Sequence, residues 1–390
     1  MSHNLGPSSP LIPPLYASAV YTLPDLDALE AIYRGEQSGY IYARDGHPNA
    51  TILADALTKL ESGRWGFVTG SGMGAITAAI LPFLSTGDRV IASHRLYGKT
   101  TQLLRKDLAR FGVTTTLVDV SDLAAVRTSL EAGPCRMVFT ETISNPLCRV
   151  SDLPQLAELA HQFGVKLIVD NTFATPVLFR PLESGTDVVI ESLTKLIGGH
   201  SDLTLGFVTG TDPDVAPSVA NAISTWGLAA NPFDCWLAVR GLGTLELRVR
   251  AATTNAVAVA NWLSQQPCVQ RVFYPGLADH PDHSLSNRLF PQGCGNMMCF
   301  ELIGGRDAVN GFMRSAPGIP FSPSLGHVHT TCSHPDSTSH RYDSPAEKRR
   351  QSITPGLLRL SVGCEPLDQI VSELQKGLTA VESLRPAPKE

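Results

Sequence analysis

Short apolar runs alternate with helical stretches from Trp65 onwards, and this alternation restricts the fold more than any other feature. The runs fall at residues 66–68, 89–92, 116–118, 137–139, 167–169 and 188–190, with one more at 204–209. An amphipathic pattern at 153–163, ended by Gly164, is typical of the helices between them. Apolar strands separated by helices predict a mostly parallel sheet covered on both faces, and hence the α/β class.

The pattern changes on either side of this region. Residues 1–24 are rich in Pro and Ser and show no period, and helical patterns follow them. After about residue 231, a long helical stretch with glycines at 241 and 243 precedes a smaller set of strands and helices. We therefore expect an N-terminal arm and helix over 1–60, a large domain over 61–245 and a small C-terminal α/β domain over 246–390.

Composition excludes several classes of protein. The chain has 31 basic and 36 acidic residues, a net charge of −5, so nucleic acid and anionic membrane are unexpected partners. The eight cysteines form no C-x-x-C pair, so neither bound metal nor a disulfide framework is expected. The first residues do not resemble a signal peptide, and the longest apolar run, 75–84, is too short to span a bilayer. A cytoplasmic protein is the expectation.

Polar residues that directly follow the apolar runs are the candidates for chemistry, because ligands of a parallel sheet bind beyond the carboxyl ends of its strands. A glycine-rich turn at 69–74 opens a helix, which favours a bound anion such as phosphate but is equally consistent with a plain tight turn. Asp170 follows the run at 167–169, where it can pair with a cationic ring nitrogen or a metal, or cap the next turn.

Two hydroxyls and an amine follow the run at 188–190. Ser192 and Thr194 alternate and Lys195 comes next, although a lysine after a strand is commonly only a solvated end. Together with the glycine-rich turn and Asp170, these residues fit pyridoxal phosphate. That cofactor needs an anion cradle, an acid beside the pyridine nitrogen and a lysine that forms a Schiff base.

The chain resembles the Cys/Met-metabolism pyridoxal-phosphate enzymes, which include cystathionine γ-synthase, cystathionine γ- and β-lyase and methionine γ-lyase. The resemblance runs from about Pro13 to Leu384 and rests on motifs in the family's order. They include Tyr40-Ile41-Tyr42-Ala43-Arg44, Ser71-Gly72-Met73, Leu96-Tyr97-Gly98, Ser144-Asn145-Pro146, Val169-Asp170-Asn171-Thr172, Ser192-Leu193-Thr194-Lys195, Ser324-Leu325-Gly326 and Leu358-Arg359-Leu360-Ser361. The family implies a fold type I pyridoxal-phosphate transferase-like fold, with the cofactor in the large domain.

The resemblance also implies roles for individual residues. Lys195 is expected to form the Schiff base with pyridoxal 5′-phosphate and to carry protons between substrate carbons. Asp170 is expected to keep the pyridine nitrogen protonated, and Tyr97 to stack on the ring and act in acid–base steps. The other expected cofactor ligands are the N–H groups of Gly72 and Met73, the Ser192 and Thr194 hydroxyls, Asn145 and, from a neighbouring subunit, Tyr42 and Arg44.

Substrate-binding residues follow from the same resemblance. Arg359 is expected to clamp the α-carboxylate and Ser324 to position Lys195 or that carboxylate. The chain departs from its relatives elsewhere: Lys99 stands where they carry Gly or Cys, Glu191 where many carry His, and residues 327–330 read His-Val-His-Thr where they carry an acid. Lys99 and His329 are therefore expected to alter the distal pocket, unless the changes are neutral drift. Metal binding by the two histidines lacks a further ligand.

The implied activity is γ-elimination or γ-replacement on an L-amino acid, as in trans-sulfuration through cystathionine. An alternative is a non-sulfur substrate with an O-linked or guanidino-oxy substituent. A non-catalytic binding protein conflicts with the intact Lys195, Asp170 and Arg359. A nicotinamide oxidoreductase conflicts with residues 91–94, which lack the acid its fold needs. The family also implies a homo-oligomer, a homotetramer formed as a dimer of dimers with shared active sites.

Overall fold

The computed structural model describes residues 7–383, and its larger part is a seven-stranded sheet of order β1-β7-β6-β5-β4-β2-β3. Its strands are β1 (Trp65–Thr69), β2 (Arg89–Ser93), β3 (Thr114–Val118), β4 (Met137–Glu141), β5 (Lys166–Asp170), β6 (Val188–Glu191) and β7 (Gly206–Gly210). β7 runs antiparallel to both β1 and β6, and the other pairs are parallel. The prediction of a mostly parallel sheet is confirmed.

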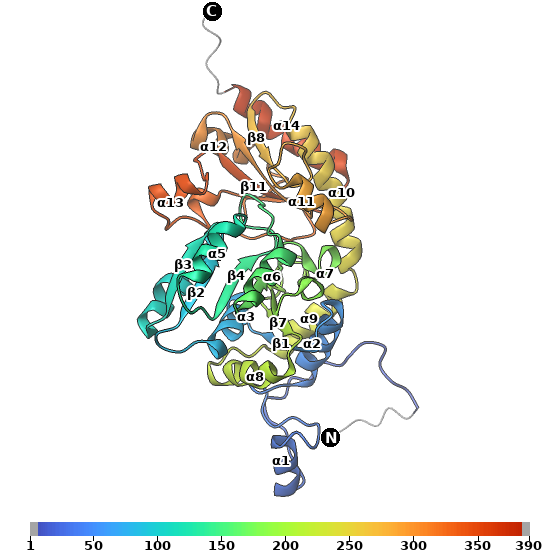
Figure 1. The fold of residues 1–390 in the computed structure, drawn as a ribbon. Helices are drawn as coiled ribbons and strands as arrows, with labels where there is room; N and C mark the ends of the chain where they lie inside the picture. Colours follow the sequence, from blue (N-terminus) through green and yellow to red (C-terminus); the bar gives the residue numbers. More distant parts are fainter. Residues whose placement is uncertain (1–6, 384–390) are drawn as a thin grey trace, which may run out of the picture.

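Helices cover both faces of this sheet, as the continuous apolar runs require (Figure 1). Ile168 and Ile190 pack with α3 (Gly72–Ile80) and α8 (Ala216–Thr225). Leu167 and Val169, which point the other way along the same strand, pack with α5 (Leu123–Glu131) and α6 (Leu153–Gln162). The sheet therefore leaves its carboxyl edge as the place where polar side chains meet.

The smaller sheet follows the large sheet in sequence, and the other helices lie before, between and after the strands of the large sheet. A four-stranded antiparallel sheet has the order β10-β11-β9-β8, formed by β8 (Val269–Phe273), β9 (Met297–Leu302), β10 (Thr331–Ser333) and β11 (Leu357–Ser361). The other helices are α1 (Leu26–Tyr33), α2 (Pro48–Leu60), α4 (Gly98–Gln102), α7 (Thr175–Leu178), α9 (Pro232–Leu242), α10 (Leu245–Leu263), α11 (His283–Leu289), α12 (Gly305–Ser315), α13 (Pro345–Arg350) and α14 (Leu367–Ser383).

The long helical stretch after residue 231 is broken at the glycines, into α9 and α10. The boundary expected at 245/246 falls at the first residue of α10. One apolar cluster joins α2 to the smaller sheet and α14, so the two parts share a core. Figure 1 shows α1 standing away from the rest of the molecule, beside the N-terminal arm. Among residues 7–383, no helix is both long enough and apolar enough to cross a bilayer.

Candidate active site

A cavity of about 570 Å³ opens at the carboxyl edge of the large sheet, beside residues of the smaller sheet. Ten of the fourteen site residues expected from sequence line it: Gly72, Met73, Tyr97, Asn145, Asp170, Ser192, Thr194, Lys195, Ser324 and Arg359. The structure therefore brings together residues as far apart in the chain as Gly72 and Arg359. The other four, Tyr42, Arg44, Lys99 and His329, line separate depressions.

Lys195 is held at the centre of the cavity by the turn that follows β6. Its Nζ donates a hydrogen bond to Ser324 Oγ at 2.9 Å. Burial, together with the positive charge of Arg359, lowers the pKa of Lys195 to about 8. An amine with so low a pKa is neutral in part near pH 7, and only a neutral amine is a nucleophile.

Asp170 ends β5 and faces the same cavity. Its Oδ1 accepts a hydrogen bond from the Thr172 backbone N–H at 3.0 Å. Burial raises the pKa of Asp170 despite that bond. A carboxylate in this setting gains most from a cationic partner, because a nearby positive charge offsets the loss of hydration.

Glu141, which was not expected from sequence, orients two of the predicted residues. It ends β4, one strand over from Asp170, and is buried. Its Oε1 accepts from the Tyr97 N–H at 2.6 Å and its Oε2 from the Asn145 N–H at 3.0 Å. Burial and the charge of Asp170 raise the pKa of Glu141 to about 8. Its place at a strand's carboxyl end is the signal that could have identified it.

Arg359 lies on β11 and is 5% exposed. Its Nη1 donates to Asn145 Oδ1 and its Nη2 to the Ser324 carbonyl, both at 2.9 Å. No carboxylate of the described chain forms an ion pair with it. A buried guanidinium oriented in this way, with no acid partner, is suited to an anionic group of a ligand.

The start of α3, where an anion cradle was predicted, presents backbone amides that are free to bind an anion. Ser71 caps the helix, and its Oγ accepts a hydrogen bond from the Gly74 N–H at 3.0 Å. The Gly72 and Met73 N–H groups lie in the first turn of the helix and have no hydrogen-bond acceptor among the described residues. A Cβ on Gly72 would lie 2.8 Å from Ser192 Oγ, so only glycine lets that hydroxyl approach the helix. The Thr194 hydroxyl already bonds to the Leu205 carbonyl and N–H.

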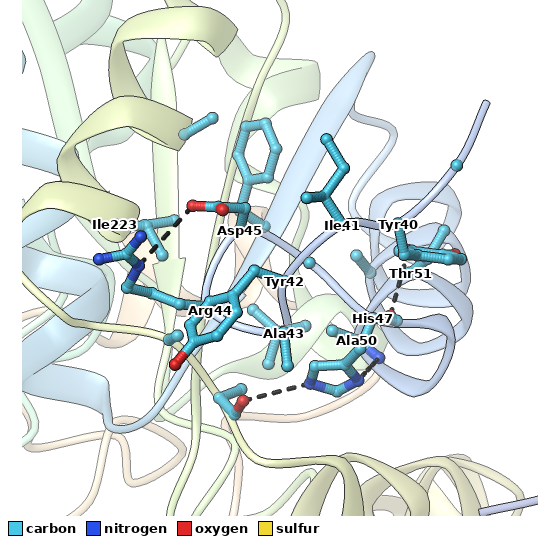
Figure 2. A pocket seen from close by; sticks show the side chains of 18 of the residues that line it. Tyr40, Ile41, Tyr42, Ala43, Arg44, Asp45, His47, Ala50, Thr51 and Ile223 are labelled. Carbon is cyan, nitrogen blue, oxygen red and sulfur yellow. Dashed lines mark hydrogen bonds and ion pairs between the residues drawn. The ribbon is translucent and has the colours of Figure 1, made fainter. Parts of the chain in front are cut away.

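Tyr42 and Arg44 lie on the loop before α2, away from the cavity. They line a separate depression of about 390 Å³ between this loop, α2 and α8. Figure 2 shows the two side chains next to each other, with the Arg44 Cζ 5.4 Å from the centroid of the Tyr42 ring. Arg44 Nε also lies 3.8 Å from Asp45 Oδ1, and its side chain is 53% exposed. Within a single chain these residues do not reach the other predicted ligands.

Lys99 and His329 occupy two further depressions. Lys99 lines a groove that shares Tyr97 and Tyr342 with the central cavity, and its Nζ donates to Gln102 Oε1 at 3.1 Å. His329 is exposed beside Glu365, and its ring centroid lies 5.4 Å from that of His327. Their substrate-binding roles stay predictions. No group of three or more His, Cys, Asp or Glu within residues 7–383 is placed to hold a metal.

The rim of the central cavity contains residues that were not expected from sequence. Arg341 and Tyr342 line it, and Tyr342 is 80% exposed. The Arg341 guanidinium and the Lys99 Nζ lie 5.9 Å and 5.8 Å from the centroid of the Tyr342 ring. Neither cation forms an ion pair within the described chain.

Four groups surround one cavity: a desolvated amine, a buried acid, a helix start with free amides and a guanidinium without an acid partner. Together they suit pyridoxal phosphate and an amino acid. The chain belongs to the Cys/Met metabolism PLP-dependent enzymes, whose family model matches residues 4–379. It is therefore an enzyme, with pyridoxal phosphate as its cofactor, and both expectations from sequence are confirmed.

Individual relatives are similar over nearly their whole length. L-methionine gamma-lyase of Pseudomonas putida is 36% identical over 371 residues, 95% of this chain and 93% of that protein. O-succinylhomoserine sulfhydrylase of Pseudomonas aeruginosa is 36% identical, covering 94% and 90%. The structure of cystathionine gamma synthase from Xanthomonas oryzae pv. oryzae in complex with cystathionine is 35% identical, with a TM-score of 0.91 over 96% of this chain and 94% of that one.

Proposed function

We propose that this enzyme eliminates or replaces the γ-substituent of an L-amino acid, with cystathionine-type substrates as the default. The names of the similar lyases, synthase and sulfhydrylase support this reaction type. The observation that carries the proposal is the meeting of Lys195, Asp170 and Arg359 around one cavity. When bound, pyridoxal phosphate supplies an electron sink for a carbanion on the amino acid.

The residues of this chain bind, orient and move protons. Arg359 binds the substrate α-carboxylate through the N–H groups that Asn145 and Ser324 leave free. Lys195 Nζ, held by Ser324, binds the cofactor covalently and afterwards moves protons at the substrate Cα and Cβ. Asp170 would pair with the pyridine nitrogen of the cofactor, and Tyr97 would stack on its ring.

The amides at the start of α3 and the Ser192 hydroxyl would hold the phosphate of the cofactor. Thr194 supports this site by its bonds to Leu205. On this assignment residues 61–245 form the cofactor domain, and residues 246–390 contribute Ser324 and Arg359 to the substrate. Arg341 at the rim and Lys99 in the adjoining groove favour a γ-substituent that ends in a negative charge.

Product analysis over a panel of amino acids tests this proposal. Methionine, cystathionine and O-succinyl-L-homoserine are compared with O-linked and guanidino-oxy amino acids, with and without a thiol nucleophile. We expect release of the γ-substituent together with an α-keto acid and ammonia, or its replacement by the thiol. Lys195→Ala is expected to abolish turnover and covalent cofactor binding. Turnover unchanged in that variant contradicts the proposal.

We also propose a homo-oligomer with shared sites, a homotetramer built as a dimer of dimers, in which Tyr42 and Arg44 reach the phosphate of the neighbouring subunit. Their position outside the central cavity supports this arrangement (Figure 2). Mixing inactive Arg44→Ala and Lys195→Ala subunits is the test. Random mixing gives about half mixed dimers, each with one intact site of two, so about a quarter of the activity should return. No recovery contradicts shared sites.

A further inference from the structure

Two buried carboxyl groups face each other behind the cofactor cavity. Glu61 caps the C-terminus of α2 and Glu191 ends β6, and they are 0% and 1% exposed. The two groups are close enough for each to shift the pKa of the other. The amide of Asn171, which follows β5, bridges them: its Nδ2 donates to Glu191 Oε1 at 3.0 Å and to Glu61 Oε1 at 3.3 Å.

No cation balances this pair. Neither carboxyl forms an ion pair within residues 7–383, and Arg180, the positive charge that acts on Glu61, is itself paired with Glu183 at 3.2 Å. The other charges that act on the pair are acidic, Glu183 on Glu61 and Asp170 on Glu191. Two ionised carboxylates in contact without a counter-charge are strongly unfavourable in a buried site.

One proton is enough to satisfy the unpaired carboxyl oxygens of the pair. Glu61 Oε2 and Glu191 Oε2 are both buried and have no donor among the described residues. One proton between the two groups gives each a partner, whereas a second proton would be a buried donor with no acceptor among the described residues. In agreement with this, burial raises the pKa of Glu61 to about 7, and burial together with the nearby Glu61 raises the pKa of Glu191 well above its ordinary value.

We propose that Glu61 and Glu191 share a single proton and, through Asn171, act as positioning residues for the cofactor-facing Asp170 and Ser192. Asn171 directly follows Asp170, and Ser192 directly follows Glu191. The hydrogen-bonding capacity of Asn171 is fully used, because its two N–H groups are divided among Glu61, Glu191 and the Phe179 carbonyl, the last at 3.0 Å, while its Oδ1 accepts from the Thr142 hydroxyl at 2.8 Å. The pair therefore ties α2 to the ends of β5 and β6.

The location of the pair gives the proton a functional consequence, which rests on the proposed function for the role of Asp170. With one proton, the pair carries one negative charge close to the acid that faces the pyridine nitrogen. Loss of the proton adds a second charge there, breaks the bond between the carboxyl groups and loosens Asn171. Positioning of Asp170 is then weakened as pH rises, the direction expected for carboxyl groups with raised pKa values.

Infrared spectroscopy of the holoenzyme tests the shared proton. The variants are Glu61→Gln, Glu191→Gln and the double variant, with Glu183→Gln as an exposed acidic control. A protonated buried carboxyl gives a carbonyl band distinct from that of carboxylates, and Glu141 is expected to keep one such band in every variant. For a shared proton, either single variant removes the same second band and the double variant removes nothing more. Two different bands lost in the two single variants overturn the proposal, as does no loss.

Cofactor affinity tests the positioning role. Glu191→Gln keeps a hydrogen-bonding group and should retain cofactor affinity within about twofold, whereas Glu191→Ala leaves Glu61 and Asn171 unpaired and should weaken it about tenfold. Wild-type affinity in Glu191→Ala overturns the positioning role. If Glu191→Ala does not fold, Glu61→Ala gives the same comparison. None of these readouts depends on the substrate, so a wrong assignment of the reaction leaves them unchanged.

Discussion

The lowered pKa of Lys195 predicts how fast the apoenzyme captures its cofactor. With a pKa of about 8, roughly one in ten Lys195 side chains is neutral at pH 7. For an ordinary lysine of pKa 10.5 the neutral fraction is roughly 200- to 300-fold smaller. Because only the neutral amine attacks the cofactor aldehyde, capture at pH 7 should exceed that of a free lysine amine by about this factor, before any gain from binding.

Rapid-mixing absorbance of the apoenzyme with pyridoxal phosphate measures this rate from about pH 6.5 to about pH 10. A lysine side-chain amine in solution provides the reference that corrects for the cofactor's own ionisation. The rate should fall about tenfold per pH unit below the inflection near pH 8 and level off above it. Arg359→Met removes the nearby positive charge, so the inflection should move to higher pH. A rate that still rises without inflection to pH 10 refutes the claim that burial sets this pKa.

Three further predictions concern binding. Arg359→Lys loses the planar fork, so KM should rise about 10- to 100-fold with a smaller effect on kcat, measured by steady-state kinetics. Gly72→Ala places a Cβ 2.8 Å from Ser192 Oγ, and cofactor dissociation, followed by absorbance, should increase about tenfold. Arg341→Ala should raise KM about two- to fivefold for O-succinyl-L-homoserine and leave KM for O-acetyl-L-homoserine unchanged. Equal increases in KM for the two esters would contradict recognition of the substrate's negative charge by Arg341.

The core of the fold follows from local pattern. Runs such as 167–169 are apolar on both faces, and the structure buries Leu167 and Val169 on one side and Ile168 on the other. The direction of β7 does not follow from such a pattern. The connection at 192–205 between β6 and β7 has no helix, and the crossover helix that parallel neighbours usually need is therefore missing. Strand direction depends on that connection and not on the strand's own residues.

The candidate site shows a similar division. The rule that strand ends carry ligands leads to Asp170 and Ser192, and applied to β4 it leads equally to Glu141. Arg341 and Tyr342 lie in an irregular segment, where neither hydrophobic period nor strand-end position indicates which way a side chain points. For such segments, a position that matches a substrate contact in relatives predicts the pocket lining less reliably. Lys99 and His329 were predicted in this way, and they do not line the central cavity.

The proposals on the shared sites and on the carboxyl pair meet in α2. The loop before α2 carries Tyr42 and Arg44, which on our assignment bind the neighbour's phosphate, and Glu61 ends the same helix beside Glu191 and Asn171. The helix is 13 residues long, so the shared proton lies about 20 Å from the loop that serves the other site. On our assignment, a charge change at the carboxyl pair therefore acts on a helix whose other end serves the neighbouring active site. Because α2 connects the two places, Glu191→Ala should weaken phosphate binding at the neighbouring site as well as at its own. In mixed dimers with Lys195→Ala subunits, the one intact site has the Glu191→Ala change in its own subunit only, so comparison with the Glu191→Ala homodimer separates the local effect from the effect on the neighbour.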